Sequence, residues 1–416
     1  MTPGHSNLRI DIDRLMGRIE TLGRIGALSG GGVCRLALTE EDRLGRDLVT
    51  GWMRDLDLDV SMDRIGNVWG IRPGIEDGPP VLLGSHIDTV ATGGLYDGAL
   101  GVLAGLEVVA ALNDAVVETR FPVAVAFFTN EEGSRFAPDM MGSAVHQGSL
   151  ALEDALKVVG IDGKTVHGEL ERIGYAGSVE PASLAPRAFL ELHIEQGPVL
   201  EREGIGIGAV TGVQGISWTE YTLTGVSNHA GTTPMSYRCD AGLVAAEAIV
   251  AARKAALEIG GSQVATVGSL TLEPNLVNVV PEKAVFTVDL RNTEEAALQQ
   301  AEKAVDAAIR NAAEAEGVSV SARSLARFEP VAFDDRIVSL IEESAMSHGL
   351  SVSRMPSGAG HDAQMFAPNC PTAMIFVPSR DGLSHNIREY TAPDEIASGA
   401  QILLETALTL ASTDFD

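Results

Sequence analysis

The sequence predicts an α/β protein with a mixed sheet, interrupted by a second, smaller α+β domain. Two observations carry this prediction. Short apolar runs bounded by glycine and proline alternate with helix-like periodicity in both terminal parts of the 416-residue chain. Between them, residues 212–328 contain a pattern of strands and helices that is complete in itself. The length favours about two domains, and 45% hydrophobic with 21% charged residues is typical of globular proteins.

The first part of the α/β domain, residues 1–211, opens with two predicted helices. Their apolar residues recur at helical spacing, and Thr39 precedes the second helix as its N-cap. Strands are predicted at short apolar runs, because strands buried on both faces are apolar throughout. The predicted helices are Ile12–Leu28, Asp42–Leu56 and Ala99–Asn113, and the predicted strands are Val81–Gly84, Val123–Thr129 and Phe189–Ile194.

The inserted segment, residues 212–328, follows the order β-α-β-β-α-β of a ferredoxin-like sandwich. Its predicted elements are Trp218–Thr224, Ala241–Glu258, Val264–Leu272, Ala284–Arg291, Glu294–Glu316 and Ser319–Arg323. The α/β pattern then resumes in residues 329–416, with a helix, a strand and a closing helix, predicted at Asp335–His348, Thr372–Val377 and Pro393–Ala411. A linear division into two domains also fits the length.

Charge and composition exclude several classes of partner. The chain has 30 Lys and Arg against 57 Asp and Glu, a formal net charge of −27, so nucleic acids and other polyanions are repelled. No apolar run approaches the roughly 20 residues of a membrane span. The three cysteines form no CxxC pair, which excludes a disulfide framework and a thiolate zinc site. We therefore expect a cytoplasmic protein without nucleic-acid or membrane partners.

The first motif that carries chemistry is LLGSHIDTV, in which His86 and Asp88 are two residues apart. Side chains at this spacing face the same way on an extended segment. The Asp88 carboxylate is therefore predicted to orient the His86 ring. Asp97 follows in the glycine-rich turn GGLYDGALG and adds a second carboxylate to this part of the chain.

Three further motifs place acidic or histidine side chains at or after predicted strand ends. Glu131 and Glu132 are adjacent and point in different directions, so one can bind metal while the other acts as a base. His193 ends a strand, and His385 follows the last strand and its loop. Three histidines and two or three carboxylates at such ends suit two zinc-class ions, about 3.5–4 Å apart across a bridge such as Asp97. Each histidine taken alone is equally explained as a hydrogen-bonded core residue.

Five motifs resemble the hydantoinase/carbamoylase branch of the dinuclear zinc M20 amidohydrolase and peptidase family. They are GSHIDTVATGGLYDGALGVLAGLEV, FFTNEEGSRF, ELHIEQGPVLE, NHAGTTPM and SGAGHDAQMFAP with SHN. The resemblance extends from about Ile12 to Ala411. It implies a zinc-peptidase-like catalytic domain in which the inserted ferredoxin-like α+β domain serves as a lid and forms a homodimer.

The resemblance also implies a role for each of the ligand candidates. Two divalent ions per subunit are expected, with zinc first and manganese, cobalt or nickel as alternatives. Glu131 would be the general base that takes a proton from the attacking water and delivers it to the leaving nitrogen. The implied ligands are His86, Asp97 and His193 for one ion, and Asp97, Glu132 and His385 for the other.

Substrate contacts are implied in both parts of the chain, at Gln214, His229, Asn278, Arg291, Gly358 and Gly360. His229 would reach across a dimer to stabilise the oxyanion, a role that suits a well-aimed donor; the alternative is a surface histidine. Arg291 is suited to a bidentate clamp on a carboxylate; the alternative is a rim salt bridge of little energetic value. Gly358 and Gly360 would allow close backbone approach. His361 is expected to shape the pocket and not to bind metal.

The function that follows is hydrolysis of the carbamoyl C–N bond of N-carbamoyl-L-amino acids, giving the amino acid, carbon dioxide and ammonia. Motifs such as NLVNVVPEKAVFTVDLRNT are closer to allantoate amidohydrolases, which keeps that activity as the main alternative. Hydrolysis of β-ureido acids, an aminoacylase or dipeptidase activity and a non-catalytic metal-binding role are further alternatives. The complete Glu131–Glu132 pair and the filled ligand positions argue against the last of these.

Overall fold

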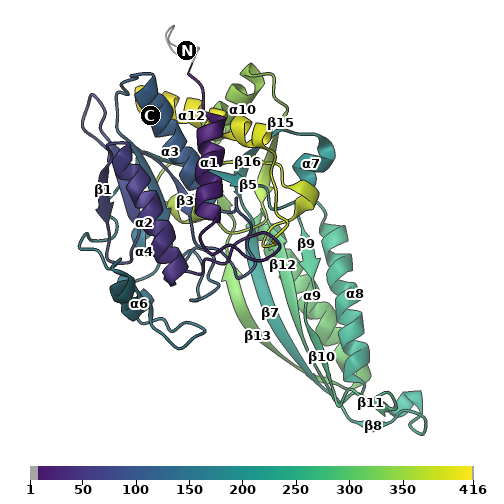
Figure 1. Cartoon of the computed structure of the whole chain (residues 1–416). Coiled ribbons are helices and arrows are strands. Elements are labelled where there is room, and N and C mark those ends of the chain that lie inside the picture. The colour runs from purple at the N-terminus through teal and green to yellow at the C-terminus, as the bar shows by residue number, and fades with distance from the viewer. Residues whose placement is uncertain (1–7, 415–416) are drawn as a thin grey trace. The chain divides into compact units, whose positions relative to one another are not determined.

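The computed structural model describes residues 8–414, which form two compact units (Figure 1). Unit 1 comprises the described residues up to Thr211 together with those from Ala332 onward, and unit 2 comprises Gly212–Val331. Within the described residues, no helix is long and apolar enough to cross a membrane. All three cysteines are free.

Unit 1 is built on a mixed sheet, which confirms the predicted α/β class. The described strands follow the order β1-β2-β4-β3-β5-β16-β6-β14, with β15 paired to β6. Its four central strands, β4, β3, β5 and β16, run parallel to one another. The strands are β1 (Asp59–Met62), β2 (Val68–Arg72), β3 (Val81–His86), β4 (Val123–Phe128), β5 (Ala188–Ile194), β6 (Ile207–Val213), β14 (Val331–Ala332), β15 (Val352–Ser357) and β16 (Thr372–Val377).

Helices cover this sheet, and α3 and α12 pack directly against its parallel strands. α3 is buried from Ala99 to Leu112. Gly101 lets α3 approach closely, because a Cβ there would lie 2.6 Å from the Leu192 carbonyl oxygen. α1 lies against both α3 and α12 (Figure 1). The helices are α1 (Ile12–Gly23), α2 (Glu40–Asp55), α3 (Ala99–Asp114), α4 (Met141–Gln147), α5 (Leu152–Ala155), α6 (Val166–Ile173), α7 (Val199–Glu203), α10 (Asp335–Ser347), α11 (Asp362–Phe366) and α12 (Pro393–Ser412), with a 3-10 turn η2 (Arg380–Gly382).

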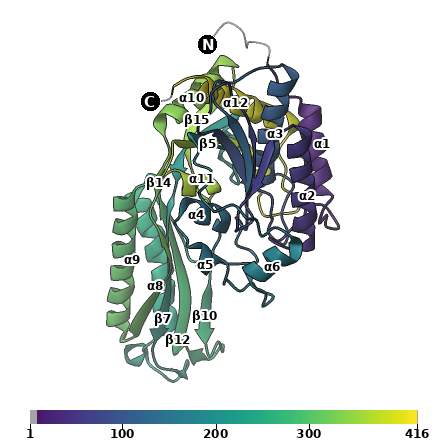
Figure 2. The same cartoon turned by 90° about the vertical axis from the view of Figure 1, so that its left-hand side faces the viewer.

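Unit 2 is a five-stranded sheet with two long helices packed on it (Figure 2). β12 alternates between buried and half-buried residues, so one sheet face and the helices enclose an apolar core that includes Leu223, Phe286 and Ile309. The elements are β7 (Gly215–Thr224), β9 (Val264–Thr266), β10 (Leu270–Glu273), β12 (Lys283–Asn292), β13 (Ser319–Phe328), α8 (Ala241–Ile259) and α9 (Glu295–Glu316), with a separate two-stranded antiparallel sheet of β8 (Asn228–His229) and β11 (Val279–Val280) and a 3-10 turn η1 (Met235–Tyr237).

Several predicted elements differ from the structure in their bounds; β13, for example, extends to Phe328 beyond the predicted Ser319–Arg323. The helix predicted at Ile12–Leu28 ends at Gly23, because the following segment turns through Gly26, whose positive φ of 81° lies in the left-handed region. The strand predicted at Val264–Leu272 is two strands, β9 and β10, whose register against β12 shifts by one residue.

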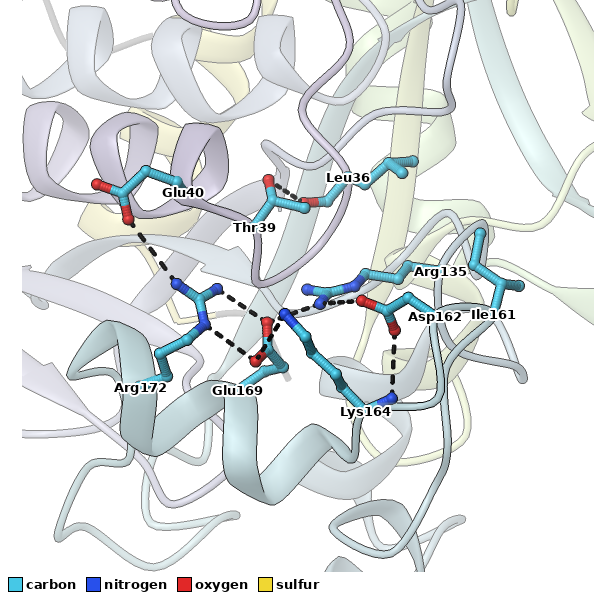
Figure 3. Close-up of a pocket in the computed structure, with 9 residues that line it drawn as sticks. All are labelled: Leu36, Thr39, Glu40, Arg135, Ile161, Asp162, Lys164, Glu169 and Arg172. Atoms are coloured by element: carbon cyan, nitrogen blue, oxygen red, sulfur yellow. Dashed lines mark hydrogen bonds and ion pairs between the residues drawn. The ribbon is translucent and has the colours of Figure 1, made fainter.

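A pocket of about 340 Å³ lies in unit 1, and its ion pairs support the segment that follows β4 (Figure 3). Glu169 of α6 accepts hydrogen bonds from Arg135 at 2.6 Å and from Arg172 at 2.9 Å. The same two guanidinium groups donate to the carbonyl oxygens of Ala37 and Leu38. The network therefore ties the loop before α2 to the segment after β4. The pocket is lined by Leu36, Thr39, Glu40, Arg135, Ile161, Asp162, Lys164, Glu169 and Arg172, and none of these is a predicted site residue.

Glu169 should make the stability of the chain sensitive to acid. The hydrogen bond from Arg172, joined by that from Arg135, lowers the pKa of Glu169 to about 2. Its stabilising contribution is then full above its ordinary pKa of 4.5 and is lost as the pH falls towards 2. We expect Glu169→Gln to lower the unfolding temperature near neutral pH. The difference in unfolding temperature between this variant and the wild type should shrink as the pH falls. The control is Glu171→Gln, a substitution at an exposed residue. A difference in unfolding temperature that does not change with pH would contradict the role assigned to Glu169.

Candidate active site

The predicted ligand residues come together at one edge of the unit 1 sheet. His86 is the last residue of β3, Glu131 and Glu132 follow β4, and His193 lies near the end of β5. His385 stands in the loop after β16. Because β4, β3, β5 and β16 are parallel neighbours, their carboxyl ends meet at the same edge, where α/β sheets usually bind ligands.

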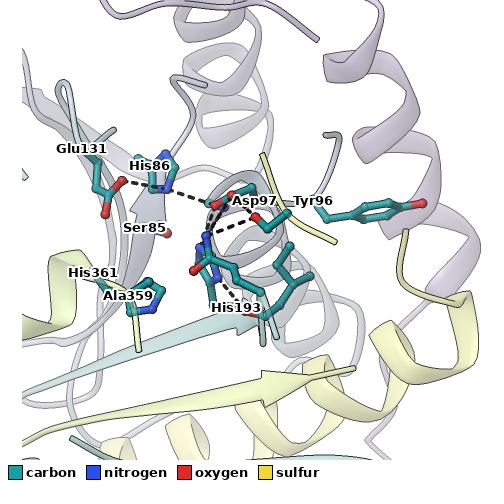
Figure 4. Close-up of polar contacts among 12 residues, drawn as sticks. Ser85, His86, Tyr96, Asp97, Glu131, His193, Ala359 and His361 are labelled. Carbon is teal, nitrogen blue, oxygen red and sulfur yellow. Dashed lines mark hydrogen bonds and ion pairs between the residues drawn. The ribbon is translucent and has the colours of Figure 1, made fainter. Parts of the chain in front are cut away.

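Asp97 lies at the centre of this cluster, and its two carboxylate oxygens face different groups (Figure 4). Oδ1 is 3.2 Å from Nε2 of His193 and 3.7 Å from Nε2 of His86. Oδ2 is 3.3 Å from Nε2 of His385, which is also 3.3 Å from Oε2 of Glu132. The carboxylate is therefore shared between two sets of ligand atoms.

The spacing of these atoms fits metal coordination. Two ligand atoms bound tetrahedrally at about 2.0–2.1 Å lie about 3.3 Å apart, and most of the distances around Asp97 are close to this value. Imidazole nitrogens with carboxylate oxygens are a donor set for zinc-class divalent cations. The groups His86–Asp97–His193 and Asp97–Glu132–His385 can each hold such an ion.

In His86 and His193, a contact of Nδ1 with a backbone carbonyl leaves the lone pair of Nε2 free to bind a metal. Nδ1 of His86 lies 2.9 Å from the carbonyl oxygen of Asp88, and Nδ1 of His193 lies 2.9 Å from that of Ile194. This geometry assigns the ring proton to Nδ1 and the lone pair to Nε2. Burial also lowers the pKa of His86 to about 4, which favours the neutral, ligating form.

The prediction that the Asp88 carboxylate orients the His86 ring is wrong. That ring contacts the backbone carbonyl of Asp88. The carboxylate instead accepts hydrogen bonds from the backbone amides of Glu131 at 3.2 Å and Glu132 at 3.3 Å. The i, i+2 spacing left open which group of Asp88 turns towards the ring. In the structure Asp88 holds the two-glutamate segment beside β3.

Glu131 and Glu132 diverge, as adjacent residues after a strand are expected to do. Oε2 of Glu131 is 3.3 Å from Nε2 of His86, whereas Oε2 of Glu132 faces His385. The preceding Asn130 has a φ of 57°, and this left-handed backbone turns the chain out of β4. Burial, together with neighbouring carboxylates, raises the pKa of both glutamates well above the usual range. A raised pKa suits a group that must take up a proton and release it again.

The sequence left several supporting residues without a role. Nε2 of Gln196 and the hydroxyl of Ser384 donate to Oδ2 of Asp97 at 3.1 Å and 2.9 Å. Glu389 accepts hydrogen bonds from the amides of Tyr96 and Asp97. Gln196 and Ser384 lie in the HIEQG and SHN motifs, so each stands beside a ligand in the sequence. Glu389 follows His385 by four residues, but the sequence around it does not indicate its partners, the amides of Tyr96 and Asp97, which are about 290 residues away.

His361 and the two predicted glycines also belong to unit 1. His361 is buried, its Nε2 lies 2.8 Å from the Ser357 hydroxyl, and its ring meets that of His193 at a centroid distance of 4.6 Å. With Glu191 and His193 it forms a third group able to hold a cation. Gly358 is exposed and Gly360 half-buried; a Cβ on Gly360 would lie 2.9 Å from Met140.

His229 and Asn278 lie together at the two-stranded β8–β11 sheet of unit 2. His229 pairs with Val279 in the β8–β11 register, and Asn278 accepts a hydrogen bond from the Ala230 amide. Nδ1 of the exposed His229 ring accepts from the amides of Gly231 and Thr232, at 3.1 and 3.2 Å. The Nε2 of a neutral His229 ring is then the protonated, donating nitrogen.

Gln214 and Arg291 lie at the other end of the unit 2 sheet. Arg291 pairs with Ile216 in the β12–β7 register, close to Gln214 at the start of β7. Its guanidinium donates to Asp289, with Nη2 at 3.0 Å from Oδ2, and lies over the Trp218 ring. The binding roles of the four unit 2 residues remain predictions.

Comparison with known proteins decides the family. The model of peptidase family M20/M25/M40 matches residues 82–409. The chain belongs to the M20 family. It is 41% identical over 410 residues to an N-carbamoyl-L-amino-acid amidohydrolase of Rhizobium meliloti, covering 98% of each chain. It is 35% identical to the allantoate amidohydrolase of Bacillus subtilis, covering 94% of this chain and 96% of that one.

Solved structures of this family agree with the fold. A hydantoinase/carbamoylase family amidase of Burkholderia multivorans superposes with a TM-score of 0.96, at 43% identity, covering 98% of this chain and 99% of the other. The predicted resemblance to the hydantoinase/carbamoylase branch of the M20 family is thereby confirmed, and the chain is an M20 hydrolase.

Gly98 should be essential for the ligand geometry. Its φ is 64°, and a Cβ there would lie 2.3 Å from the His86 ring. We expect Gly98→Ala to displace His86 and to weaken Zn²⁺ or Mn²⁺ binding by about 10- to 100-fold, measured by competition with a chromophoric chelator. The matched control is Gly17→Ala in α1, where an added Cβ meets nothing within 4 Å. It should bind metal normally and unfold at the same or a higher temperature. Equal metal affinity of the two variants would contradict the role of Gly98.

Proposed function

We propose that this chain hydrolyses the carbamoyl C–N bond of N-carbamoyl-L-amino acids, releasing the amino acid, carbon dioxide and ammonia. The observation that carries the proposal is the Asp97 carboxylate shared between two sets of ligand atoms, with Glu131 beside it. The relative from Rhizobium meliloti, similar over nearly the whole chain, supports the choice of substrate. The free cysteines fit a reducing, cytoplasmic setting.

Two divalent cations per subunit would be held at Asp97. Zinc is our first choice because the donors are imidazoles and carboxylates, and manganese, cobalt and nickel are alternatives. One ion is assigned to His86, Asp97 and His193, and the other to Asp97, Glu132 and His385. When bound, such a pair supplies Lewis acidity for the carbamoyl carbonyl and for the attacking water.

Three side chains of the protein perform the remaining steps. Glu131 takes a proton from the attacking water and returns it to the nitrogen that leaves, a transfer suited to its raised pKa. Nε2–H of His229 donates to the carbonyl oxygen as negative charge develops there. Arg291 binds the substrate carboxylate through its guanidinium fork, beside Gln214.

The geometry of unit 2 supports a homodimer. Arg291 is eight residue steps along β12 from Lys283, or about 26 Å at 3.3 Å per residue, and the β8–β11 sheet with His229 lies beyond that end (Figure 1). A small ureido acid cannot contact both groups of one protomer. If both act on one substrate, one of them comes from the partner subunit, and we assign that role to His229.

Exposed apolar side chains on unit 2 also favour this assignment. On α8, Leu243, Val250 and Leu257 recur every seven residues, on one face of the helix, and are 41%, 67% and 71% exposed. A row of this kind is expected to be covered in an oligomer. We therefore propose that the segment 212–328 is the inserted, ferredoxin-like lid and dimerisation domain.

Allantoate is the second candidate substrate, favoured by the similarity to the Bacillus subtilis enzyme. Allantoate is also a ureido acid with a carboxylate, so the roles of Glu131, His229 and Arg291 would carry over. The two candidates differ in the groups around the carboxylate, and a direct comparison of substrates distinguishes them.

The test is a product assay of Zn²⁺- or Mn²⁺-loaded protein by mass spectrometry. Substrates are a panel of N-carbamoyl-L-amino acids, N-carbamoyl-β-alanine, allantoate, N-acetyl amino acids and dipeptides. We expect free amino acids from the carbamoyl panel and little turnover of the rest. Rapid consumption of allantoate alone would overturn the first assignment and support the second.

The variant Glu131→Gln tests the assigned base within the same assay. Glutamine keeps the shape of the side chain but cannot accept the proton, so kcat should fall about 10²- to 10⁴-fold. Metal content should stay at the wild-type level, because Glu131 is not an assigned ligand. Near-wild-type turnover with full metal occupancy would contradict the role of Glu131.

Mixed dimers test whether His229 acts across the interface. His229→Ala and Glu131→Gln are each expected to be nearly inactive, with losses of at least about 10²-fold. After subunit exchange at equal concentrations, half of the dimers are mixed and one of their two sites is intact, so activity should recover to about a quarter of wild type. The control mixes Arg291→Ala with Glu131→Gln and should recover nothing. Absence of recovery in the first mixture would contradict the dimer assignment.

A further inference from the structure

One buried carboxylate touches both the loop that carries Asp97 and the loop that carries His385. Glu389 is 6% exposed and stands four residues after His385. Its Oε1 accepts hydrogen bonds from the backbone amides of Tyr96 and Asp97, each at 3.1 Å. Its Oε2 lies 3.4 Å from the hydroxyl of Ser384. The side chain thus joins the Asp97 loop to the Ser384–His385 loop.

The surrounding residues make room for this carboxylate. A Cβ on Gly94 would lie 2.1 Å from Oε1 of Glu389, so the glycine leaves the space that the carboxylate occupies. Tyr96 precedes Asp97 in the sequence, and Tyr390 follows Glu389. Their rings meet edge to face at a centroid distance of 6.1 Å. Two loops distant in the sequence are therefore packed around Glu389.

The contact bears directly on the orientation of the Asp97 carboxylate. Ser384, held near Glu389, donates to Oδ2 of Asp97 at 2.9 Å, and Gln196 donates to the same oxygen at 3.1 Å. Oδ1 is left facing His193. Glu389 thus fixes the backbone beside Asp97, while Ser384 and Gln196 fix its Oδ2. These contacts together determine which carboxylate oxygen of Asp97 faces which set of ligands.

We propose that Glu389 is a positioning residue for the metal pair. By holding the amides of Tyr96 and Asp97 against the Ser384–His385 loop, it keeps one oxygen of Asp97 towards each ligand set. Glu389 touches neither substrate nor metal in this role. The inference rests on the metal centre of the proposed function and extends it to a residue outside both ligand sets.

Three substitutions separate the hydrogen bonds from the charge and the length of the side chain. Glu389→Ala removes the acceptor of both amides. Glu389→Gln keeps an oxygen that can accept both, so it should restore the function of the contact. Glu389→Asp keeps the charge but is one methylene shorter and cannot span the two loops. The matched control is Glu395→Ala, because Oε2 of Glu395 also accepts a backbone amide, that of Ala392, without contacting the Asp97 loop.

The measurement is Co²⁺ binding by chelator competition, together with the visible absorption spectrum of the Co²⁺-loaded protein. Glu389→Ala should bind Co²⁺ about 10- to 100-fold more weakly and change the intensity of the visible bands. Glu389→Asp should show an intermediate loss. Glu389→Gln and Glu395→Ala should remain within a few-fold of wild type, with unchanged spectra.

The outcomes separate this inference from the proposed function. Wild-type affinity and spectrum in Glu389→Ala would overturn the positioning role while leaving the metal pair intact. If Glu389→Ala fails to fold, as judged from its unfolding transition, Glu389→Asp decides: wild-type Co²⁺ binding in that variant overturns the inference. Failure of the wild-type protein to bind two ions would instead overturn the proposed function.

Discussion

The shared carboxylate of Asp97 is the interaction on which the site depends. Asp88, Asp97 and Glu131 are buried at one sheet edge beside the half-buried Glu132, and burial with mutual repulsion opposes ionisation of the glutamates. Cations placed between the carboxylates and the histidines would offset that repulsion, and Asp97 is the group that can serve two of them. The parallel strands supply the rest of the arrangement, because their carboxyl ends bring distant segments to one edge.

Three residues of the site have left-handed backbone. Asn130, which precedes the two glutamates, Gln196, which donates to Asp97, and His385 itself have φ values of 57°, 57° and 53°. Such conformations cost energy in residues other than glycine and persist where the surroundings hold them. Asn130 shows how: its side-chain amide donates to the carbonyl oxygens of Phe136 and Pro138. At Asn130 the turn takes the chain out of β4, so that Glu131 and Glu132 reach different partners within one cluster.

The sequence predicted those parts of the site that local patterns encode. Apolar runs ending in His86 or His193 located the strands and their ligand ends, and adjacent Glu131 and Glu132 were expected to diverge. It could not predict contacts made by backbone groups or across long separations. The two-residue spacing of His86 and Asp88 does not indicate whether the carbonyl or the carboxylate of Asp88 contacts the ring. The sequence around Glu389 does not indicate that it binds amides about 290 residues away. The β6 strand was missed because IGAVTGV mixes glycine and threonine with apolar residues, which blurs the period-two signal.

The two units divide the proposed reaction between them. The proton transfer from the attacking water to the leaving nitrogen is assigned to Glu131 in unit 1, and that step is the same for N-carbamoyl amino acids and allantoate. These substrates differ around the carboxylate, which is assigned to Arg291 and Gln214 of unit 2. Arg291 already donates to Asp289, so a substrate carboxylate must share or replace that contact. Arg291 and Asp289 are half-buried. A substrate carboxylate that pairs poorly with Arg291 would leave charges without a partner there, so the fit of this exchange, more than the metal centre, would decide which ureido acid is accepted.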